Sequence, residues 1–168
     1  MKIGVISDTH DHMENITKAV KIFNERNIDV LIHCGDYVSA FTFRVFDDLN
    51  PNIKNNFYGV YGNNDGDKLF LHQILGQICH LVGMELISEF DGIRVYATHM
   101  PNKETVDSIA KSGNFEIILF GHTHSSVIEK YDNGVLVVNP GECCGYLSGK
   151  ATIAIIDTHI IDAEIIEI

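Results

Sequence analysis

The segment KIGVISDTH, residues 2–10, places an apolar run directly before a group of polar side chains. The run Lys2–Ser7 has the length and composition of a buried strand. A helix is expected next, because Ile16, Ala19, Val20 and Phe23 fall on one helical face. A second apolar run, Val30–Cys34, follows the helix. Strand, helix and strand in this order are typical of two parallel strands joined by a crossover helix, so the chain is predicted to be α/β.

The middle of the chain continues this alternation. The predicted elements are helices over 40–49 and 68–75, a strand over 57–61, and strands over 84–90 and 93–99. Asp91-Gly92 separates the last two strands and favours a tight hairpin turn. Val106, Ile109 and Ala110 then indicate a helix, which Gly113 is placed to end.

From Glu116 onwards the pattern is rich in short strands. The predicted strands cover 117–120, 126–131, 135–138, 151–157 and 163–168. They suggest a second sheet packed on the first. No linker, repeat or low-complexity tract divides the chain, so we expect one domain over residues 1–168.

The composition fits one globular domain, since 45% of the 168 residues are hydrophobic. The N-terminal segment is a short apolar run that fits neither a secretory signal nor a membrane span, and we expect a cytoplasmic protein. The four cysteines, at positions 34, 79, 143 and 144, contain no C-x-x-C pair. We interpret them as free thiols.

The formal charge of −11 argues against one class of partner. Surfaces that track long DNA or RNA rest on clustered Lys and Arg, which this chain lacks. A long nucleic acid is therefore not expected as a substrate. An anionic substrate would need a local source of positive charge, and bound cations are the obvious source.

Polar residues of the kinds that bind metals recur where predicted strands end. The blocks are Asp8-Thr9-His10, Gly35-Asp36, Gly62-Asn63-Asn64-Asp65, Thr98-His99 and Gly121-His122-Thr123-His124. Ligands collect at the carboxyl ends of strands in α/β sheets, so we expect these blocks to converge. The two-residue spacing within the first and last blocks puts both side chains on one side of an extended backbone. Carboxylates with imidazoles suit Mn, Fe, Ni, Co or Zn better than Mg.

In this order, the five blocks resemble the signature of the calcineurin-like metallophosphoesterase superfamily. The chain is most similar to the small single-domain prokaryotic phosphodiesterase branch, often called YfcE-like, from Ile3 to about Gly145. One block alone more often marks a turn than a metal site, whereas five blocks in order are specific. The resemblance implies a four-layer α/β/β/α sandwich of two packed mixed sheets with flanking helices.

The resemblance also assigns roles to residues of this chain. It implies that one metal ion is bound by Asp8, His10 and His124, that Asp36 bridges two ions, and that the second site is completed by Asn63, His99 and His122. Asn139–Gly141 resembles a family loop that shapes the pocket without binding metal. Asp65 is placed to hold its own loop behind the ligands.

The implied reaction is hydrolysis of a small phosphodiester with two divalent transition-metal ions per chain. Mn is expected first, and Ni, Fe, Co and Zn are alternatives. A hydroxide that bridges the ions would attack phosphorus in line, so no nucleophilic side chain is required. The local charge would be about +1 when two divalent ions, two aspartates and one hydroxide are added together. This charge would attract phosphate to an otherwise acidic protein.

Two positions depart from the family pattern. Many members place a histidine after the ligand asparagine, where it protonates the leaving oxygen, but this chain has Asn64, which has no titrating proton. Asn64 and His12 are therefore the residues considered for a catalytic role, with an exposed loop histidine as the equal interpretation of His12. We expect aryl esters and diesters to be preferred over alkyl monoesters. Met100 follows His99, where glycine is common, and places an apolar side chain beside the pocket.

The remaining features favour structural roles. His33 lies on an apolar strand and is interpreted as a hydrogen-bonded structural histidine. The isoleucine-rich stretch 153–168 is interrupted by acidic residues and is interpreted as a sheet edge or the contact of a homodimer.

Two other functions stay open. The superfamily includes a retromer subunit that keeps the fold as a protein-binding scaffold with an impaired metal site, but the complete ligand set of this chain favours catalysis. A nuclease or nucleotide monophosphatase would use the same ions. The acidic charge disfavours a polynucleotide track, while the pocket walls that separate monoesters from diesters cannot be read from the sequence.

Overall fold

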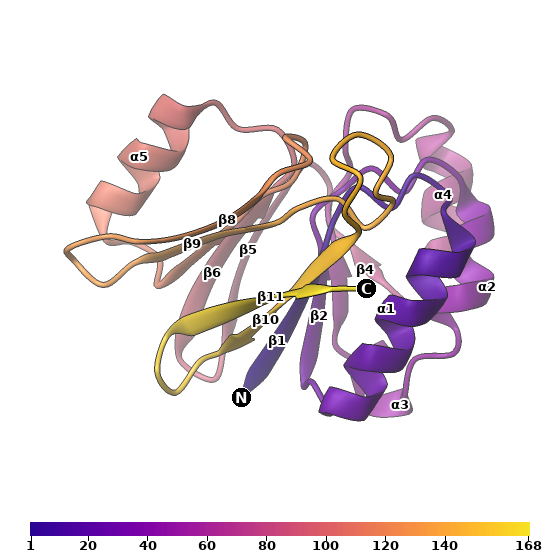
Figure 1. The fold of residues 1–168 in the computed structure, drawn as a ribbon, viewed down its shortest axis with the longest axis horizontal. Coiled ribbons are helices and arrows are strands. Elements are labelled where there is room, and N and C mark those ends of the chain that lie inside the picture. The colour runs from indigo at the N-terminus through magenta and orange to yellow at the C-terminus, as the bar shows by residue number, and fades with distance from the viewer.

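The computed structural model describes residues 1–168 and stacks them in four layers: helices, a sheet, a second sheet and a single helix (Figure 1). Three clusters of buried apolar side chains fill the spaces between these layers. A cluster of 20 residues lies under the first helical layer, one of 16 lies between the sheets, and one of 6 lies under the single helix. The predicted α/β/β/α sandwich is confirmed.

The first sheet has six strands in the order β11-β10-β1-β2-β3-β4. The strands are β1 (Lys2–Ile6), β2 (Val30–His33), β3 (Phe57–Gly59), β4 (His80–Leu81), β10 (Thr152–Asp157) and β11 (Asp162–Glu167). The strands β1 to β4 are parallel, β10 pairs antiparallel with β1, and β11 pairs antiparallel with β10 at the edge of the sheet. Ile3 and Val5 of β1 contact the second sheet, while Ile6 packs under the helices.

The first helical layer begins with α1 (Met13–Arg26), the crossover between β1 and β2. His12 caps its N-terminus by accepting a hydrogen bond from the backbone N–H of Asn15 at 3.2 Å, and Asn27 ends it in a left-handed conformation. The predicted apolar face is buried as expected. Gly4 of β1 lets this face approach the sheet, since a Cβ there would lie 2.8 Å from Phe23 Cε1.

The other helices of this layer are η1 (Ala40–Thr42), α2 (Phe43–Phe46), α3 (Pro51–Lys54) and α4 (Lys68–Leu75). The helix predicted over 40–49 is thus shorter and begins with a 3-10 turn, whose N-terminus Ser39 caps by accepting from the backbone of Phe41. Such turns are common at helix ends. The bounds of α4 match the prediction.

The second sheet has the order β5-β6-β7-β9-β8. Its strands are β5 (Glu85–Phe90), β6 (Ile93–Thr98), β7 (Ile117–Leu119), β8 (Ser126–Lys130) and β9 (Leu136–Pro140). Asp91 and Gly92 have φ angles of 56° and 82°, as the tight hairpin turn requires. The helix α5 (Lys103–Ser112) covers the outer face of this sheet and ends at Gly113 with φ 66°.

The strands after Glu116 do not all belong to the second sheet, which corrects the prediction. Only β7, β8 and β9 do, whereas β10 returns to the first sheet and carries β11 with it. The sequence of β10 fits a central strand because both of its faces are apolar. Ile153 and Ile155 pack under the helices, while Ala154 and Ile156 pack between the sheets.

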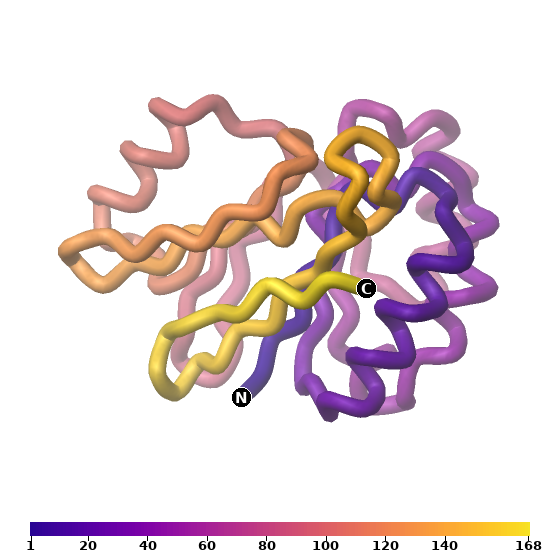
Figure 2. The backbone as a smooth tube through the Cα atoms, in the orientation of Figure 1, coloured from indigo at the N-terminus to yellow at the C-terminus, as the bar shows by residue number.

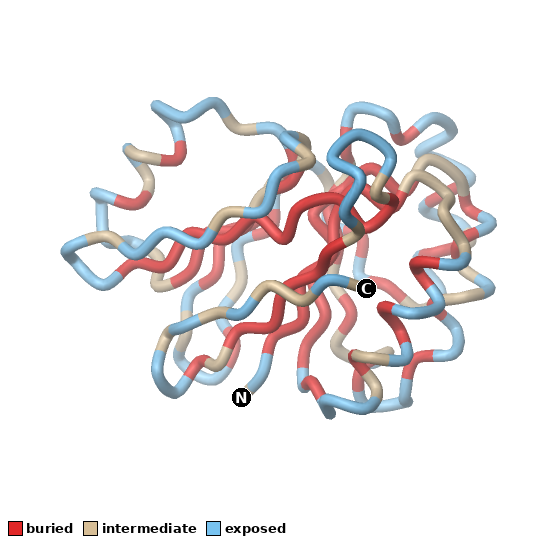
Figure 3. The backbone as a smooth tube through the Cα atoms, viewed as in Figure 1, coloured by how far each residue is buried: buried red, intermediate tan, exposed pale blue.

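The loops at the carboxyl ends of the parallel strands gather at one end of the sandwich. The tube in Figure 2 shows the segment after β1 beside the loop after β9, and hydrogen bonds join these segments from Cys143 N to Ser7 O at 3.0 Å and from Cys144 N to Asp8 O at 3.1 Å. Figure 3 shows that the strands leading to these loops are buried along most of their length. No helix combines the length and apolar character needed to cross a membrane.

Candidate metal centre

Most of the predicted ligands sit on backbone in the left-handed region. The φ angles are 52° at Asp8, 40° at His10, 61° at Asp36, 68° at His122 and 59° at His124. This conformation is uncommon outside glycine and tends to cluster at functional sites. The pairs spaced by two residues are therefore not in extended backbone, and that part of the prediction is wrong. In the first pair the turn leaves His10 Nε2 3.9 Å from Asp8 Oδ1, whereas in the last pair His124 lies by Asp8 and His122 lies against His99.

Hydrogen bonds between the loops hold this conformation. Asp8 N donates to Gly35 O at 3.0 Å and His10 N to Asp36 O at 3.1 Å, so the loops after β1 and β2 run together. His122 N donates to Asp8 Oδ2 at 3.0 Å, which ties the loop after β7 in the second sheet to the first sheet. The ends of both sheets thus build one site.

One group of side chains surrounds Asp8. Ligand atoms of Asp8, His10 and Asp36 lie within 4.8 Å of one another. His10 Nε2 is 3.9 Å from Asp8 Oδ1 and 3.6 Å from Asp36 Oδ2, and His124 Nε2 is 3.5 Å from Asp8 Oδ1. The rings of His10 and His124 stack with centroids 5.3 Å apart. The structure brings these four residues together.

A second group lies on the other side of Asp36. His99 Nε2 is 3.3 Å from Asp36 Oδ2 and 3.0 Å from Asn63 Oδ1, and the ring of His122 lies against His99 at 5.3 Å. Asp36 Oδ2 therefore faces an imidazole nitrogen of each group. This is the placement expected of a carboxylate shared between two ions.

The polar atoms of the site fit bound cations. Asp8 Oδ1 and His10 Nε2 are buried and have no hydrogen-bond partner. His99 Nδ1 donates to the carbonyl oxygen of Cys34 at 2.7 Å, yet its Nε2 also faces oxygen atoms, although a neutral imidazole carries only one proton. Unpaired buried groups are costly, so cations beside these oxygen and nitrogen atoms would satisfy the site.

The two buried aspartates differ in their proton affinity. Burial raises the pKa of the Asp8 carboxyl above its ordinary value. Burial acts in the same direction on Asp36, but the neighbouring imidazole of His99 and the hydrogen bonds from Asn64 outweigh it and hold the pKa of that carboxyl below its ordinary value. Asp36 is thus kept as a carboxylate in the middle of the cluster.

Two glycines of the sequence blocks are required by close approach to these carboxylates. A Cβ on Gly62 would lie 2.1 Å from Asp36 Oδ1, and a Cβ on Gly121 would lie 2.0 Å from Ser7 Oγ and 2.9 Å from Asp8 Oδ2. All three distances are too short for a Cβ atom. Each glycine therefore allows one loop to pack onto an aspartate of another loop.

Residues behind the cluster hold the loops in place. Asp65 is buried and accepts from Gly62 N at 2.6 Å and Val38 N at 2.8 Å, so it links two loops rather than only its own. Asn139 donates through Nδ2 to Gly121 O at 2.9 Å and supports the loop after β7. His33 hydrogen-bonds Thr9 Oγ1 at 3.1 Å and stacks on Tyr37, in line with a structural role.

Asn64 and His12, the two residues considered for a catalytic role, make different contacts. Asn64 Nδ2 donates to Asp36 Oδ2 at 2.8 Å, and its backbone N–H donates to Asp36 Oδ1 at 2.8 Å. His12 caps α1 through Nδ1, and its ring lies 5.3 Å from the ring of Tyr146. Met100 is exposed beside His99.

Sequence reasoning missed Glu142, a buried residue two positions after Pro140. Its carboxylate accepts from His124 Nδ1 at 2.6 Å. The only sequence feature that could have pointed to Glu142 is the preceding Asn-Pro-Gly, which was expected to shape the pocket. The cysteines follow the prediction, since all four are free, and all are buried.

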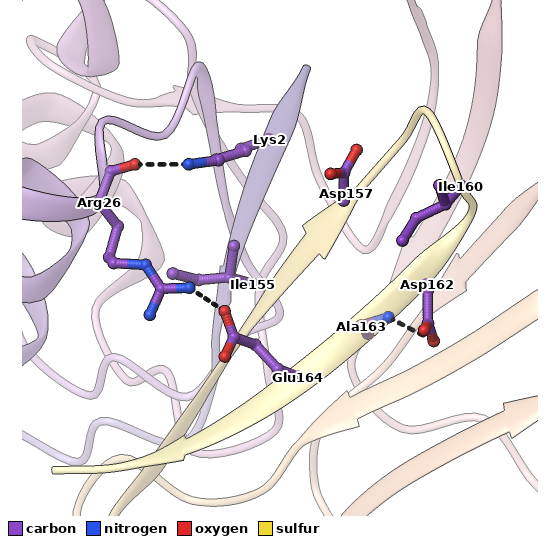
Figure 4. Close-up of a pocket in the computed structure, with 8 residues that line it drawn as sticks. All are labelled: Lys2, Arg26, Ile155, Asp157, Ile160, Asp162, Ala163 and Glu164. Carbon is purple, nitrogen blue, oxygen red and sulfur yellow. Dashed lines mark hydrogen bonds and ion pairs between the residues drawn. The ribbon is translucent and has the colours of Figure 1, made fainter.

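A separate pocket lies at the amino end of β1, away from Asp8 (Figure 4). Its cations are already engaged, because Lys2 Nζ donates to Arg26 O at 3.2 Å and the guanidinium of Arg26 pairs with Glu164. Asp157 and Asp162 add negative charge. This pocket offers no free cation to a phosphate group, so we do not place the reaction there.

Known proteins share both the sequence pattern and the fold. The calcineurin-like phosphoesterase superfamily domain matches residues 1–160. The phosphodiesterase MJ0936 of Methanocaldococcus jannaschii is 45% identical over 161 residues, which cover 95% of this chain and 94% of that protein. The solved structure of an archaeal phosphodiesterase is 43% identical, with a TM-score of 0.90 and full coverage of both chains.

A more distant structure shares the fold alone. The phosphoesterase Yfce from E. coli is 19% identical, with a TM-score of 0.68 over 94% of this chain and 89% of that one. The match over residues 1–160 and the identity of 45% over nearly the whole length place the chain in one family. It belongs to the calcineurin-like phosphoesterase superfamily.

Proposed function

We propose that this protein is a phosphodiesterase that hydrolyses small phosphodiesters and depends on two divalent cations. One observation carries the proposal: Asp36 Oδ2 lies 3.6 Å from His10 Nε2 and 3.3 Å from His99 Nε2, between two groups of metal-ligating side chains. A relative of 45% identity that is named a phosphodiesterase, and a solved structure of 43% identity described as an archaeal phosphodiesterase, support the diester as the substrate class.

The proposed ligands divide into two sets around Asp36. Asp8, His10 and His124 would hold one ion, and Asn63, His99 and His122 the other. Mixed oxygen and nitrogen ligands suit transition metals, and Mn is the ion we expect first. When bound, such ions supply positive charge for the phosphate oxygens and lower the pKa of a coordinated water.

The chain's own residues then have three tasks. Asp36 and Asp8 would hold the cations in the site, while the net charge of −11 on the whole chain repels anions. Asn64 fixes the orientation of Asp36 through two hydrogen bonds of 2.8 Å, which is a positioning role. His12 accepts through Nδ1, so its neutral ring carries the proton on Nε2, and this is the proton that we propose for a leaving oxygen.

The expected substrate preference follows from Asn64. An amide has no titrating proton for the leaving group, so poor leaving groups such as alkoxides depend on His12 alone. We expect aryl diesters to be hydrolysed faster than alkyl monoesters. The variant His12→Asn keeps an N-cap for α1 and should slow alkyl leaving groups more than aryl ones.

The test is hydrolysis of bis(p-nitrophenyl) phosphate and p-nitrophenyl phosphate by chelator-stripped protein, with single metals added back. His124→Ala is the test variant, and His80→Ala, an exposed histidine outside the cluster, is its control. We expect metal-dependent diester hydrolysis that His124→Ala abolishes and His80→Ala leaves unchanged.

The other outcomes separate the alternatives. Stoichiometric metal binding without turnover of any ester would favour the protein-binding scaffold. Hydrolysis of monoesters alone would identify a monophosphatase. Absence of metal binding would overturn the assigned ligands.

Three predictions from the sequence accompany this function: one domain over residues 1–168, a cytoplasmic location and a homodimer. For the dimer, β11 is the edge strand of the first sheet, and its outer backbone edge is available for pairing. Sedimentation velocity of the full chain decides between monomer and dimer.

A further inference from the structure

Glu142 is a fully buried carboxylate beside the proposed ligands but outside their set. Its Oε2 atom accepts from His124 Nδ1 at 2.6 Å and from Cys144 Sγ at 3.1 Å. Its Oε1 atom accepts from Leu147 N at 2.9 Å and from Ser148 N. Every neighbour that faces the carboxylate is a donor.

This environment fits Glu142 as a carboxylate that accepts on both oxygen atoms. The four donors that face it are two side chains, His124 and Cys144, and the backbone N–H groups of Leu147 and Ser148. A carboxylate can only accept, so the proton of the neutral His124 ring must lie on Nδ1. The lone pair on Nε2 then faces Asp8 Oδ1, 3.5 Å away.

His99 offers the internal comparison. Its Nδ1 also donates, but to the uncharged carbonyl oxygen of Cys34 at 2.7 Å. Hydrogen bonds to a charged acceptor are roughly twice as strong as neutral ones, and a carboxylate behind an imidazole raises its basicity as a ligand. The histidines on the two sides of Asp36 are therefore supported unequally.

We propose that Glu142 is a positioning residue that fixes His124 in the tautomer offering Nε2 to a cation, and thereby makes the Asp8–His10–His124 position the tighter of the two. The inference rests on the proposed function, since it requires the two ions. It predicts that the ions bind in two resolved steps.

Glu142 is not the only anchor of its loop. Asn15 Nδ2 donates to both Cys143 O and Cys144 O at 3.1 Å, and Cys143 N donates to Ser7 O at 3.0 Å. The loop therefore keeps connections to α1 and β1 when the charge of Glu142 is removed. A neutral substitution separates the effect on His124 from the effect on the loop.

The variant Glu142→Gln makes this separation. Its amide oxygen can still accept from the backbone of Leu147 and Ser148. Its amide nitrogen would face His124 Nδ1 as a donor, which favours the opposite tautomer and removes the lone pair from Nε2. Glu116→Gln is the matched control, because Glu116 accepts from the backbone N–H of Arg94 at 2.7 Å on the second sheet and touches no proposed ligand.

The first measurement is a calorimetric titration of chelator-stripped protein with Mn²⁺. We expect two steps in the wild type, and Glu142→Gln should weaken the tighter step by about 10- to 100-fold, the usual cost of losing such a partner. The weaker step and both steps of Glu116→Gln should stay unchanged. Equal weakening of both steps, an unchanged tight step, or a single class of equal sites in the wild type would overturn the inference.

The second measurement reads the His124 tautomer without metal. Long-range ¹H–¹⁵N NMR of the stripped protein should show the proton on Nδ1 in the wild type and Glu116→Gln, and on Nε2 in Glu142→Gln. The same tautomer in all three proteins would overturn the inference. If the wild type bound no Mn²⁺ at all, the proposed function would fail instead, so the two failures are distinguishable.

Discussion

The two sheets contribute different chemistry to the same site. Loops of the first sheet supply both proposed aspartate ligands together with Asn63 and His10, whereas loops of the second sheet supply only the imidazoles of His99, His122 and His124. The first sheet thus carries the negative charge that attracts cations. The second sheet completes the coordination.

The sheets also differ in how they are supported. The first is covered by α1 to α4 over a cluster of 20 buried residues, and the second by α5 alone over a cluster of 6 (Figure 1). A further 16 residues pack the sheets together. The metal centre therefore lies where the first sheet, with its full layer of helices, meets the second sheet, which has one helix. We expect it to form only when the two sheets are packed as in this structure.

The largest effect is expected from Asp36, the side chain shared by both groups. Asp36→Asn removes one negative charge from both ion positions, so we expect it to lose both ions. His122→Ala, on the second sheet, should lose one ion and keep the other. Metal analysis after dialysis against Mn²⁺ measures this difference as metal per chain.

Loss of a residue that only supports a metal ligand typically lowers activity by about 10- to 100-fold. Activity should fall by more than this in both variants, because each loses a ligand. Circular dichroism checks that each variant is folded. Two ions per chain in folded Asp36→Asn would contradict the shared role of this aspartate.

The contact between the sheets is tested next with a pair of glycines. A Cβ on Gly121 would lie 2.0 Å from Ser7 Oγ, whereas a Cβ on Gly66 would lie 4.0 Å from its nearest neighbour, Val38 O. Gly121→Ala should displace the loop after β7 and impair metal binding. Gly66→Ala, in the Asn63 loop of the same site, should bind both ions as the wild type does. Comparable metal affinity in the two variants would show that the close approach is dispensable.

Local sequence signals predicted much of the fold. Asp91-Gly92 encodes the hairpin through residues that tolerate positive φ, and the bounds of α4 follow from its apolar spacing. The return of β10 to the first sheet was missed, because a strand that is apolar on both faces fits either sheet. The choice is made by long-range pairing, such as Gly4 with Ile155, which no local pattern contains.

The site shows the same division. The ligating residue types at strand ends led to the set that the structure brings together, but the left-handed backbone of Asp8 and His124 was not foreseen, because these conformations are imposed by contacts with other loops. Glu142 was missed for a related reason. Its importance comes from burial and from a partner 18 residues earlier in the chain.

A smaller effect is expected from truncating core side chains. The loss of stability should be greater under the helices of the first sheet than under the single helix of the second. Val20 on α1 lies in the cluster of 20 residues, and Val106 on α5 lies in the cluster of 6, so each tests one helical layer. We expect Val20→Ala to lower the free energy of unfolding by about 2 kcal/mol and Val106→Ala by about 1 kcal/mol. Both variants replace valine by alanine in a helix, so any gain in helix propensity is the same for both. Urea denaturation measures the free energy of unfolding of each variant. An equal loss would show that the thin cover of the second sheet is packed as tightly as the first.

The smallest effects should come from exposed ion pairs. Here we expect the larger loss of stability on the second sheet rather than on the first. The side chain of Glu164 on the first sheet pairs with the guanidinium of Arg26, whereas Glu116 on the second sheet accepts from both the side chain and the backbone N–H of Arg94. We expect Glu116→Gln to lower the melting temperature more than Glu164→Gln, and by less than Val106→Ala.

The pH dependence follows from the hydrogen bonds of Arg94, which lower the pKa of Glu116 below its ordinary value of 4.5. A lowered pKa means that the stabilisation is fully present above pH 4.5 and is lost as the pH falls through the lowered pKa. The melting difference between the wild type and Glu116→Gln should therefore be constant at neutral pH, disappear in acid, and shrink in 1 M salt, where the screening length is about 3 Å. A difference that persists in acid would mean that Glu116 acts through shape rather than charge, and the reversal between the sheets would then have no electrostatic origin.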